Sequence, residues 1–236
     1  MAEHATTKMW TKPDQLTAID RQGSALRIQL TARDVIILDA ITHRVKLLSL
    51  PQIARTWWKG SRAIMQARKR IRQLALAGYL ERLQLFTNQE VMLLAPLATW
   101  HSGMAVPDFS TIVRLTRTRW ELPIRSTACV VATSVSAVRT GGSYRIPRNS
   151  EATHDLHVAQ VYLHKLRQAP RYAEKWSGEM ELLTRDIAPC DKVPDALIRQ
   201  AGRCTAVEVV GESYSVTKLM AFHEFCSRRS FTYELW

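Results

Sequence analysis

The chain has 236 residues, 46% of them hydrophobic and 23% charged, with only 9 glycines and 9 prolines. This composition excludes a disordered or fibrous chain and predicts a buried core, in one large domain or two modest ones. No apolar run approaches the roughly 20 residues of a membrane-spanning helix. Residues 1–6 lack the basic and apolar regions of a secretory signal, and the four cysteines form no CxxC pair. We therefore expect reduced thiols in a cytoplasmic protein.

The positive charge is concentrated in one part of the chain. Lys and Arg number 33 against 21 Asp and Glu, a formal net charge of +12. Residues 1–150 hold 22 basic and 9 acidic residues, whereas residues 151–236 hold 11 and 12. The asymmetry predicts two functional parts, the first of which meets a polyanion, above all nucleic acid. A membrane surface is a distant alternative, and a solvated basic face without a ligand is another.

The first 60 residues predict a short strand and two helices. Residues 24–30 alternate between apolar and polar side chains, as in a strand. Thr31 is a candidate N-cap for a helix that runs to about residue 45. Ser49 and Pro51 then open a second helix, because proline is tolerated in a first turn.

A third helix is expected over residues 61–77. Its apolar residues at positions 64, 67, 71, 74 and 75 form one stripe, and Gly78 ends the helix as a C′ glycine. Residues 51–80 contain seven basic residues and no acidic one. Residues 79–85 and 90–94, around a turn at 87–89, then read as a β-hairpin.

Three helices, the last of them basic, followed by a hairpin predict a winged helix-turn-helix that binds double-stranded DNA. A helix in the major groove uses Arg and Lys to contact phosphates and guanine edges. A solvated helix in an ordinary helical domain and a helix-turn-helix used for protein contact stay open as alternatives. The expected DNA contacts are Lys59, Arg62, Arg68, Lys69, Arg70 and Arg72.

The middle of the chain, residues 96–150, is predicted to be a linker or bridging segment. It contains Pro96, Pro107 and Pro123 and no long periodic pattern, although a short helix could start near Asp108. Residues 128–138 read equally well as a strand or a short helix.

The last third predicts the order helix, three strands, helix, strand. The helices are expected over about 151–166 and 215–228. The first three strands are expected at 179–183, 193–198 and 205–210, and the last at 231–236.

This order resembles the core of the PD-(D/E)xK nuclease superfold. Pro194 and Asp195 match its PD element, and Glu208 lies 13 residues later in the next strand. Two carboxylates on neighbouring strands are suited to chelating Mg²⁺, which activates water and offsets charge on the scissile phosphate. Val210 stands where the superfold has its lysine, and Lys218 on the following helix is a candidate substitute.

The helix that starts near residue 151 offers further candidate ligands or bases. Glu151 is the expected third metal ligand, with His154 or Asp155 as alternatives. His154 and His157 share a helix face, but a zinc site normally has four ligands and no further partner is evident, so a structural pair is the better interpretation. An acidic residue in an apolar strand can also pair with a nearby base, which leaves a non-catalytic domain open.

The whole chain also resembles the replication-relaxation family of plasmid and mobile-element proteins. The resemblance covers most of residues 31–236 and is carried by residues 70–80, 153–156, 194–197, 207–212 and the helix with Lys218. It implies DNA binding at plasmid origins or transfer regions, in support of replication or mobilisation, with a nuclease-derived C-terminal domain that need not be catalytic.

We therefore predict an α+β and α/β protein in three parts. Residues 1–95 form the winged helix-turn-helix, 96–150 the bridge, and 151–236 a restriction-endonuclease-like α/β domain. The leading function is DNA binding for a mobile element. The alternative is a metal-dependent DNA nuclease that uses Asp195, Glu208 and Lys218, with Mg²⁺ required only in that case. Subunits of a replication, mobilisation or transposition complex and a second copy of the chain are further candidate partners.

Overall fold

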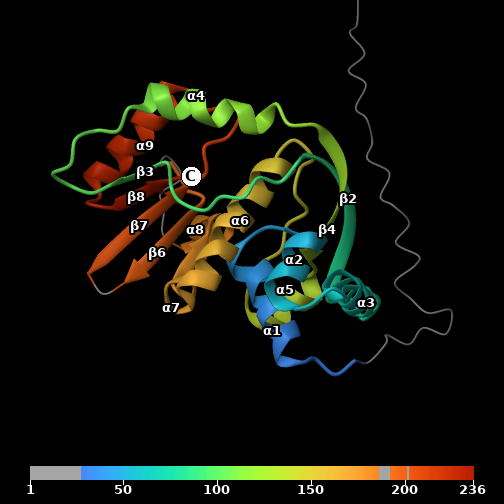
Figure 1. The fold of residues 1–236 in the computed structure, drawn as a ribbon. Coiled ribbons are helices and arrows are strands. Elements are labelled where there is room, and N and C mark those ends of the chain that lie inside the picture. Colours follow the sequence, from blue (N-terminus) through green and yellow to red (C-terminus); the bar gives the residue numbers. More distant parts are fainter. Residues whose placement is uncertain (1–27, 186–191, 201) are drawn as a thin grey trace, which may run out of the picture.

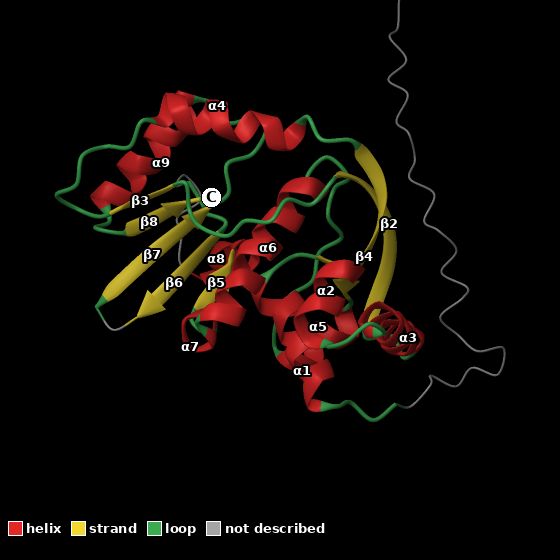
Figure 2. Cartoon of the chain, viewed as in Figure 1, coloured by secondary structure: helices red, strands yellow, loops and turns green. Residues whose placement is uncertain are grey.

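The computed structural model describes residues 28–185, 192–200 and 202–236 and shows a mixed α/β chain with two sheets (Figure 1). One sheet has the strand order β1-β4-β2, and we call it sheet A. The other, sheet B, has the order β3-β8-β7-β6-β5. Helix α6 (Ala152–Gln168) lies between them (Figure 2). No helix of the described residues combines the length and apolar character needed to cross a membrane.

The helices before sheet A form largely where capping predicts them. Helix α1 (Ala32–Asp39) starts at Thr31 with a capping box to Asp34 and continues into a π-helical turn, η2 (Ala40–Arg44). Strand β1 (Leu48–Ser49) leads into α2 (Leu50–Trp57), whose Ser49 N-cap forms a second capping box. Helix α3 (Ala63–Leu76) follows. Of the strand predicted over 24–30, the described residues 28–30 form none.

The predicted hairpin after α3 was wrong in its second strand. Strand β2 (Leu80–Asn88) pairs along its whole length with β4 (Ile124–Ala132), and residues 90–94 form no strand. Strand β4 supplies apolar side chains to both faces of sheet A, whereas Glu90 in the predicted strand forms an ion pair with Arg55 at 2.6 Å. The longer strand, whose apolar side chains are buried on both faces, therefore takes the place beside β2.

The predicted bridge over residues 96–150 contributes to both sheets. Strand β3 (Ala98–Trp100) is an edge strand of sheet B, and β4 is the central strand of sheet A. Between them, α4 (Phe109–Trp120) packs against α9 (Val216–Arg228). The segment 128–138, predicted as either a strand or a short helix, contains part of each. Strand β4 ends at Ala132, and helix α5 (Ser134–Thr140) follows.

The last third of the chain differs from the predicted order helix, three strands, helix, strand, because helices α7 (Pro170–Ala173) and α8 (Glu179–Arg185) flank its first strand. Strands β5 (Trp176–Gly178), β6 (Ala196–Gln200) and β7 (Arg203–Glu208) are antiparallel neighbours. Strand β8 (Thr232–Leu235) pairs parallel with β7 through α9. The strand predicted at 179–183 is instead helix α8, directly after β5, and the short helix α7 precedes that strand.

The two faces of sheet B are buried against different helices. Val207, Val209 and Trp236 pack in the core shared with α6, α2 and α3. Leu197, Ala206 and Tyr233 pack in a separate core with α4 and α9. Residues that follow one another along β6 and β7 therefore face different helices, and this alternation decides the surroundings of the acidic residues at their ends.

Candidate functional site

Helix α3 carries an exposed basic surface. Ala67, Ile71 and Leu74 are buried against the core, while Ile64, the first residue of the predicted apolar stripe, is 38% exposed. The basic residues on the outside of α3 and in the turn before it are exposed, and none forms an ion pair with an acidic side chain among the described residues; they are Lys59, Arg62, Arg68, Lys69 and Arg72. We call these five residues the basic surface of α3.

Arg70, the sixth predicted contact, points into the protein instead. Its guanidinium nitrogens lie 2.6–3.1 Å from the Asp34 carboxylate and 2.8 Å from the Gln29 carbonyl oxygen. Burial raises the pKa of Asp34, but the hydrogen bonds from Arg70 and Thr31 outweigh this effect and leave the pKa below its ordinary value. Arg70 therefore holds α3 against the start of α1.

The two predicted strand acids are neighbours in the sheet. Asp195 immediately precedes β6 and Glu208 ends β7, next to the paired residues Ala196 and Val207. The Asp195 amide donates a hydrogen bond to the Glu208 carboxylate at 3.4 Å. The sequence thus placed both residues correctly at one edge of adjacent strands.

Their carboxylates, however, bind different partners. Asp195 accepts a hydrogen bond from the Val209 amide at 2.7 Å and lies 3.4 Å from His154 Nε2 on α6. Glu208 lies 2.7 Å from Lys192 Nζ and accepts a hydrogen bond from the Tyr214 hydroxyl. Each acid is thus already neutralised by its own cation.

The charge states follow from these contacts. Burial raises the pKa of Asp195, but His154 and the Val209 amide outweigh it and keep the pKa below its ordinary value. Burial and then the Asp195 charge raise the pKa of Glu208, although Lys192 and Tyr214 oppose them. Burial lowers the pKa of His154, but Asp195 and Asp155 outweigh it and raise that pKa well above its ordinary value. Both shifts favour the charged forms of Asp195 and His154.

Of the other predicted members of this site, Glu151 lies apart from it, and Lys218 reaches only the Tyr214 ring, whose centroid is 5.6 Å from its Nζ. Lys218 Nζ is 3.1 Å from the Ser213 hydroxyl, and the Lys218 side chain is exposed. Glu151 pairs with Arg145 at 3.6 Å and Arg148 at 3.4 Å. Lys192 is the lysine that contacts Glu208, and no spacing in the sequence pattern pointed to it.

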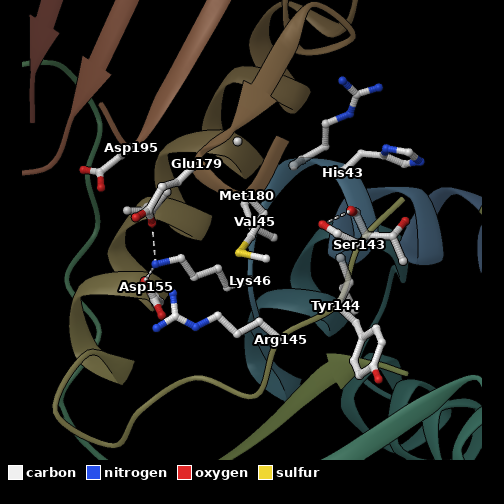
Figure 3. Close-up of a pocket in the computed structure, with 15 residues that line it drawn as sticks. His43, Val45, Lys46, Ser143, Tyr144, Arg145, Asp155, Glu179, Met180 and Asp195 are labelled. Carbon is white, nitrogen blue, oxygen red and sulfur yellow. Dashed lines mark hydrogen bonds and ion pairs between the residues drawn. The ribbon is translucent and has the colours of Figure 1, made fainter. Parts of the chain in front are cut away.

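A small cavity lies beside this site and is lined in part by Lys46. Its volume is about 20 Å³, and Asp155, Glu179 and Asp195 are among its lining residues. Lys46, which precedes β1, lies 3.2 Å from Asp155 and 2.5 Å from Glu179 (Figure 3). This lysine joins the N-terminal helices to α6 and α8. No sequence pattern pointed to Lys46, because its two contacts each span more than 100 residues.

The two histidines of α6, His154 and His157, lie in different surroundings. His154 faces Asp195 and its Nε2 lies 3.0 Å from the Val209 carbonyl oxygen. His157 is 1% exposed and meets the Trp120 ring edge-on at 5.3 Å. Burial, Arg119 and His154 lower the pKa of His157 to about 3, so its ring is neutral. The pair does not share a ligand.

The groups around Asp195 and Glu208 bear on the predicted Mg²⁺ site. Within the described part of the chain, no three Asp, Glu, His or Cys side chains are close enough to hold one metal ion together. Mg²⁺ is commonly held by one or two carboxylates together with water and phosphate oxygens, and the Asp195 and Glu208 carboxylates here lie against His154 and Lys192. No protein-family model, curated protein or solved structure matches the chain.

Proposed function

We propose that this protein binds double-stranded DNA through the basic surface of α3. The observation that carries the proposal is that its five side chains are exposed and form no ion pair with a described acid. Other basic residues, such as Arg44, Lys46, Arg55 and Arg70, are held by acids. Cations without an acidic partner, gathered on one helix and the turn before it, are suited to a phosphate backbone.

The order of the elements supports a winged helix-turn-helix. Three helices lead into the antiparallel pair β2 and β4, and β1 adds to the far side of β4. In such a protein the third helix enters the major groove. Together with the resemblance to the replication-relaxation family, this order favours a role in replication or mobilisation of a plasmid or mobile element.

The order of sheet B supports a restriction-endonuclease-like domain that binds rather than cuts. Helix α6, the antiparallel strands β5 to β7, helix α9 and the parallel strand β8 follow the order expected for that core, with the additional short helices α7 and α8 on either side of β5. The two acids at the expected position are each paired with a cation. A domain of this kind stabilises the DNA-binding part or contacts other subunits of a replication complex.

The experiment is a salt titration of DNA binding. Replacing Arg68, Lys69 and Arg72 with Ala removes three expected phosphate contacts, so the slope of log affinity against log salt should fall by about 2.7, at about 0.9 per contact. The matched control replaces Arg171, Lys175 and Arg203, which are also exposed. Fluorescence anisotropy with a labelled duplex measures both. Equal affinities and slopes for the two folded variants would overturn the proposal.

A nuclease is the second candidate function, and Lys192 is the observation that favours it. Its ammonium lies 2.7 Å from Glu208 and supplies the lysine that the sequence pattern lacks at Val210. Nicking of supercoiled plasmid with Mg²⁺ or Mn²⁺ tests this candidate. Nicking by the wild type that Asp195→Ala removes would establish cleavage at this site, and nicking that survives the substitution would reject the site.

A further inference from the structure

The end of helix α4 is tied to sheet A and to the start of α6. Asn88, the last residue of β2, donates hydrogen bonds from its side-chain amide to the carbonyl oxygens of Trp120 and Leu122, both at 2.8 Å. The Asn88 backbone amide donates to Thr153 Oγ1 in the first turn of α6 at 3.0 Å. One residue therefore joins three elements at a common junction.

Three side chains at this junction carry buried nitrogen atoms without a partner. These atoms are Arg119 Nη1, Trp120 Nε1 and both ring nitrogens of His157, and none has a hydrogen-bond partner within the described part of the chain. The His157 ring meets the Trp120 ring edge-on, with centroids 5.3 Å apart. Arg119 is close enough for its charge to lower the pKa of His157. The four nitrogens thus belong to one group of neighbouring side chains.

This group consists mainly of hydrogen-bond donors. Guanidinium and indole nitrogens only donate, and a neutral imidazole donates through one of its two nitrogens. A buried donor costs free energy unless an acceptor meets it, and folded proteins satisfy nearly all of them. A hydrogen-bond acceptor is therefore expected among Arg119, Trp120 and His157, and no side chain of the described residues provides it.

The charges of the junction favour a negatively charged acceptor. Burial lowers the pKa of Arg119, and no acid of the described residues opposes this shift. Glu151 and Asp155, the acids at the start of α6, form ion pairs with other basic residues. Glu121, which follows α4, is exposed to solvent. A guanidinium that is partly removed from water without an acid is stabilised by an anion.

The enclosure of the group limits the size of this anion. All four nitrogens are covered from solvent, and His157 is only 1% exposed. A phosphate group, with four oxygens around its centre, needs more room than a monatomic ion. Chloride accepts hydrogen bonds from several N–H groups without a preferred direction. The Arg119 side chain is only partly buried, so an ion bound beside it can exchange with solvent.

We infer that Arg119, Trp120 and His157 bind a chloride ion that holds the end of α4 against α6. The ion neutralises the Arg119 guanidinium and accepts hydrogen bonds from the Trp120 indole and the His157 ring. The inference is independent of the proposed DNA binding, because none of these residues belongs to the basic surface of α3.

The test compares the effect of chloride on stability among variants. The midpoint of thermal unfolding is measured in sodium gluconate, whose anion is too large for the site, and in sodium chloride at equal ionic strength. The change from gluconate to chloride should raise the midpoint of the wild type by about 3 °C more than that of Arg119→Gln or His157→Phe. General effects of the salts cancel in this comparison. Arg117→Gln is the matched control, since Arg117 is exposed on the same helix and should respond like the wild type.

A crystal of the wild-type protein soaked in bromide gives a second measurement, which does not depend on a variant that folds. Bromide replaces chloride and scatters anomalously, so a peak within hydrogen-bond distance of Arg119, Trp120 and His157 is the expected result. An ordered water at that position would overturn the inference, as would equal chloride responses of the wild type, Arg119→Gln and His157→Phe. A larger midpoint rise in sodium phosphate than in sodium chloride, lost in Arg119→Gln, would overturn the assignment to a monatomic ion.

Discussion

Arg70 Nη2 lies 2.6 Å from Asp34 Oδ2, and this ion pair removes the central arginine of α3 from the basic surface of that helix. The Asp34 side chain is 1% exposed and that of Arg70 is 22% exposed. Sequence position alone groups Arg70 with Lys69 and Arg72, but the three residues have different tasks. Arg70 stabilises the fold, and its neighbours face the solvent.

Arg70→Ala should therefore destabilise the protein more than it weakens DNA binding. It leaves the buried Asp34 carboxylate without its partner, which costs about 3 kcal/mol of unfolding free energy. Lys69→Ala should change stability by less than about 0.5 kcal/mol and lower affinity at low salt. Urea unfolding and anisotropy measure the two effects. Equal stability of the two variants would show that the ion pair is not held in solution.

The same pair predicts a pH dependence of stability. The pKa of Asp34 is below its ordinary value of 3.8 in the folded protein. Its stabilising contribution is therefore complete above pH 3.8 and is lost as the pH falls through the lower folded value. The difference in unfolding free energy between wild type and Asp34→Asn should shrink in that acidic range. If the difference in unfolding free energy stayed constant from neutral pH down to about pH 2, the stabilising role of the Asp34 carboxylate would be contradicted.

Lys192 and Lys218 should differ sharply when each is replaced with Met. Lys192→Met leaves Glu208, which is 1% exposed, without a cation and with only the Tyr214 hydroxyl and the Asp195 amide as hydrogen-bond donors, and should cost about 3 kcal/mol of stability. Lys218 contacts Ser213 on the surface, and its replacement should cost less than about 0.5 kcal/mol. Thermal unfolding at neutral pH compares them. A larger loss of stability for Lys218→Met would indicate that Lys218, the lysine predicted from the sequence, is the partner of Glu208 instead.

Gly178→Ala should loosen the contact between the N-terminal helices and sheet B. A Cβ at Gly178 would overlap the Arg44 carbonyl oxygen, and Arg44 is also bonded to Trp176 through both its side chain and its carbonyl group. Because the obstacle is backbone, the expected cost is about 2 kcal/mol or more. Ser177→Ala, at the neighbouring position of β5, is the control for chemical denaturation. Equal denaturation midpoints for the two variants would show that η2 shifts to make room for the Cβ without loss of stability.

The sequence by itself determined the features that depend on neighbours along the chain. Thr31, Ser49 and Ser215 each cap the helix that begins beside them, because a capping side chain reaches only two or three residues. The spacing of apolar residues along α3 likewise predicted which of its faces is buried, and so which of its basic residues are exposed. The positions of Asp195 and Glu208 at one edge of adjacent strands also followed from strand order.

Tertiary structure decided every choice between distant partners. Strand β2 pairs with residues 124–132 rather than 90–94, because a strand binds the segment that best buries its two faces, whatever lies between them. Asp34 selects Arg70 among the basic residues of α3, and Glu208 selects Lys192 rather than Lys218. A buried carboxylate takes the cation that the fold brings within hydrogen-bond distance, and that distance is set by packing and not by sequence spacing.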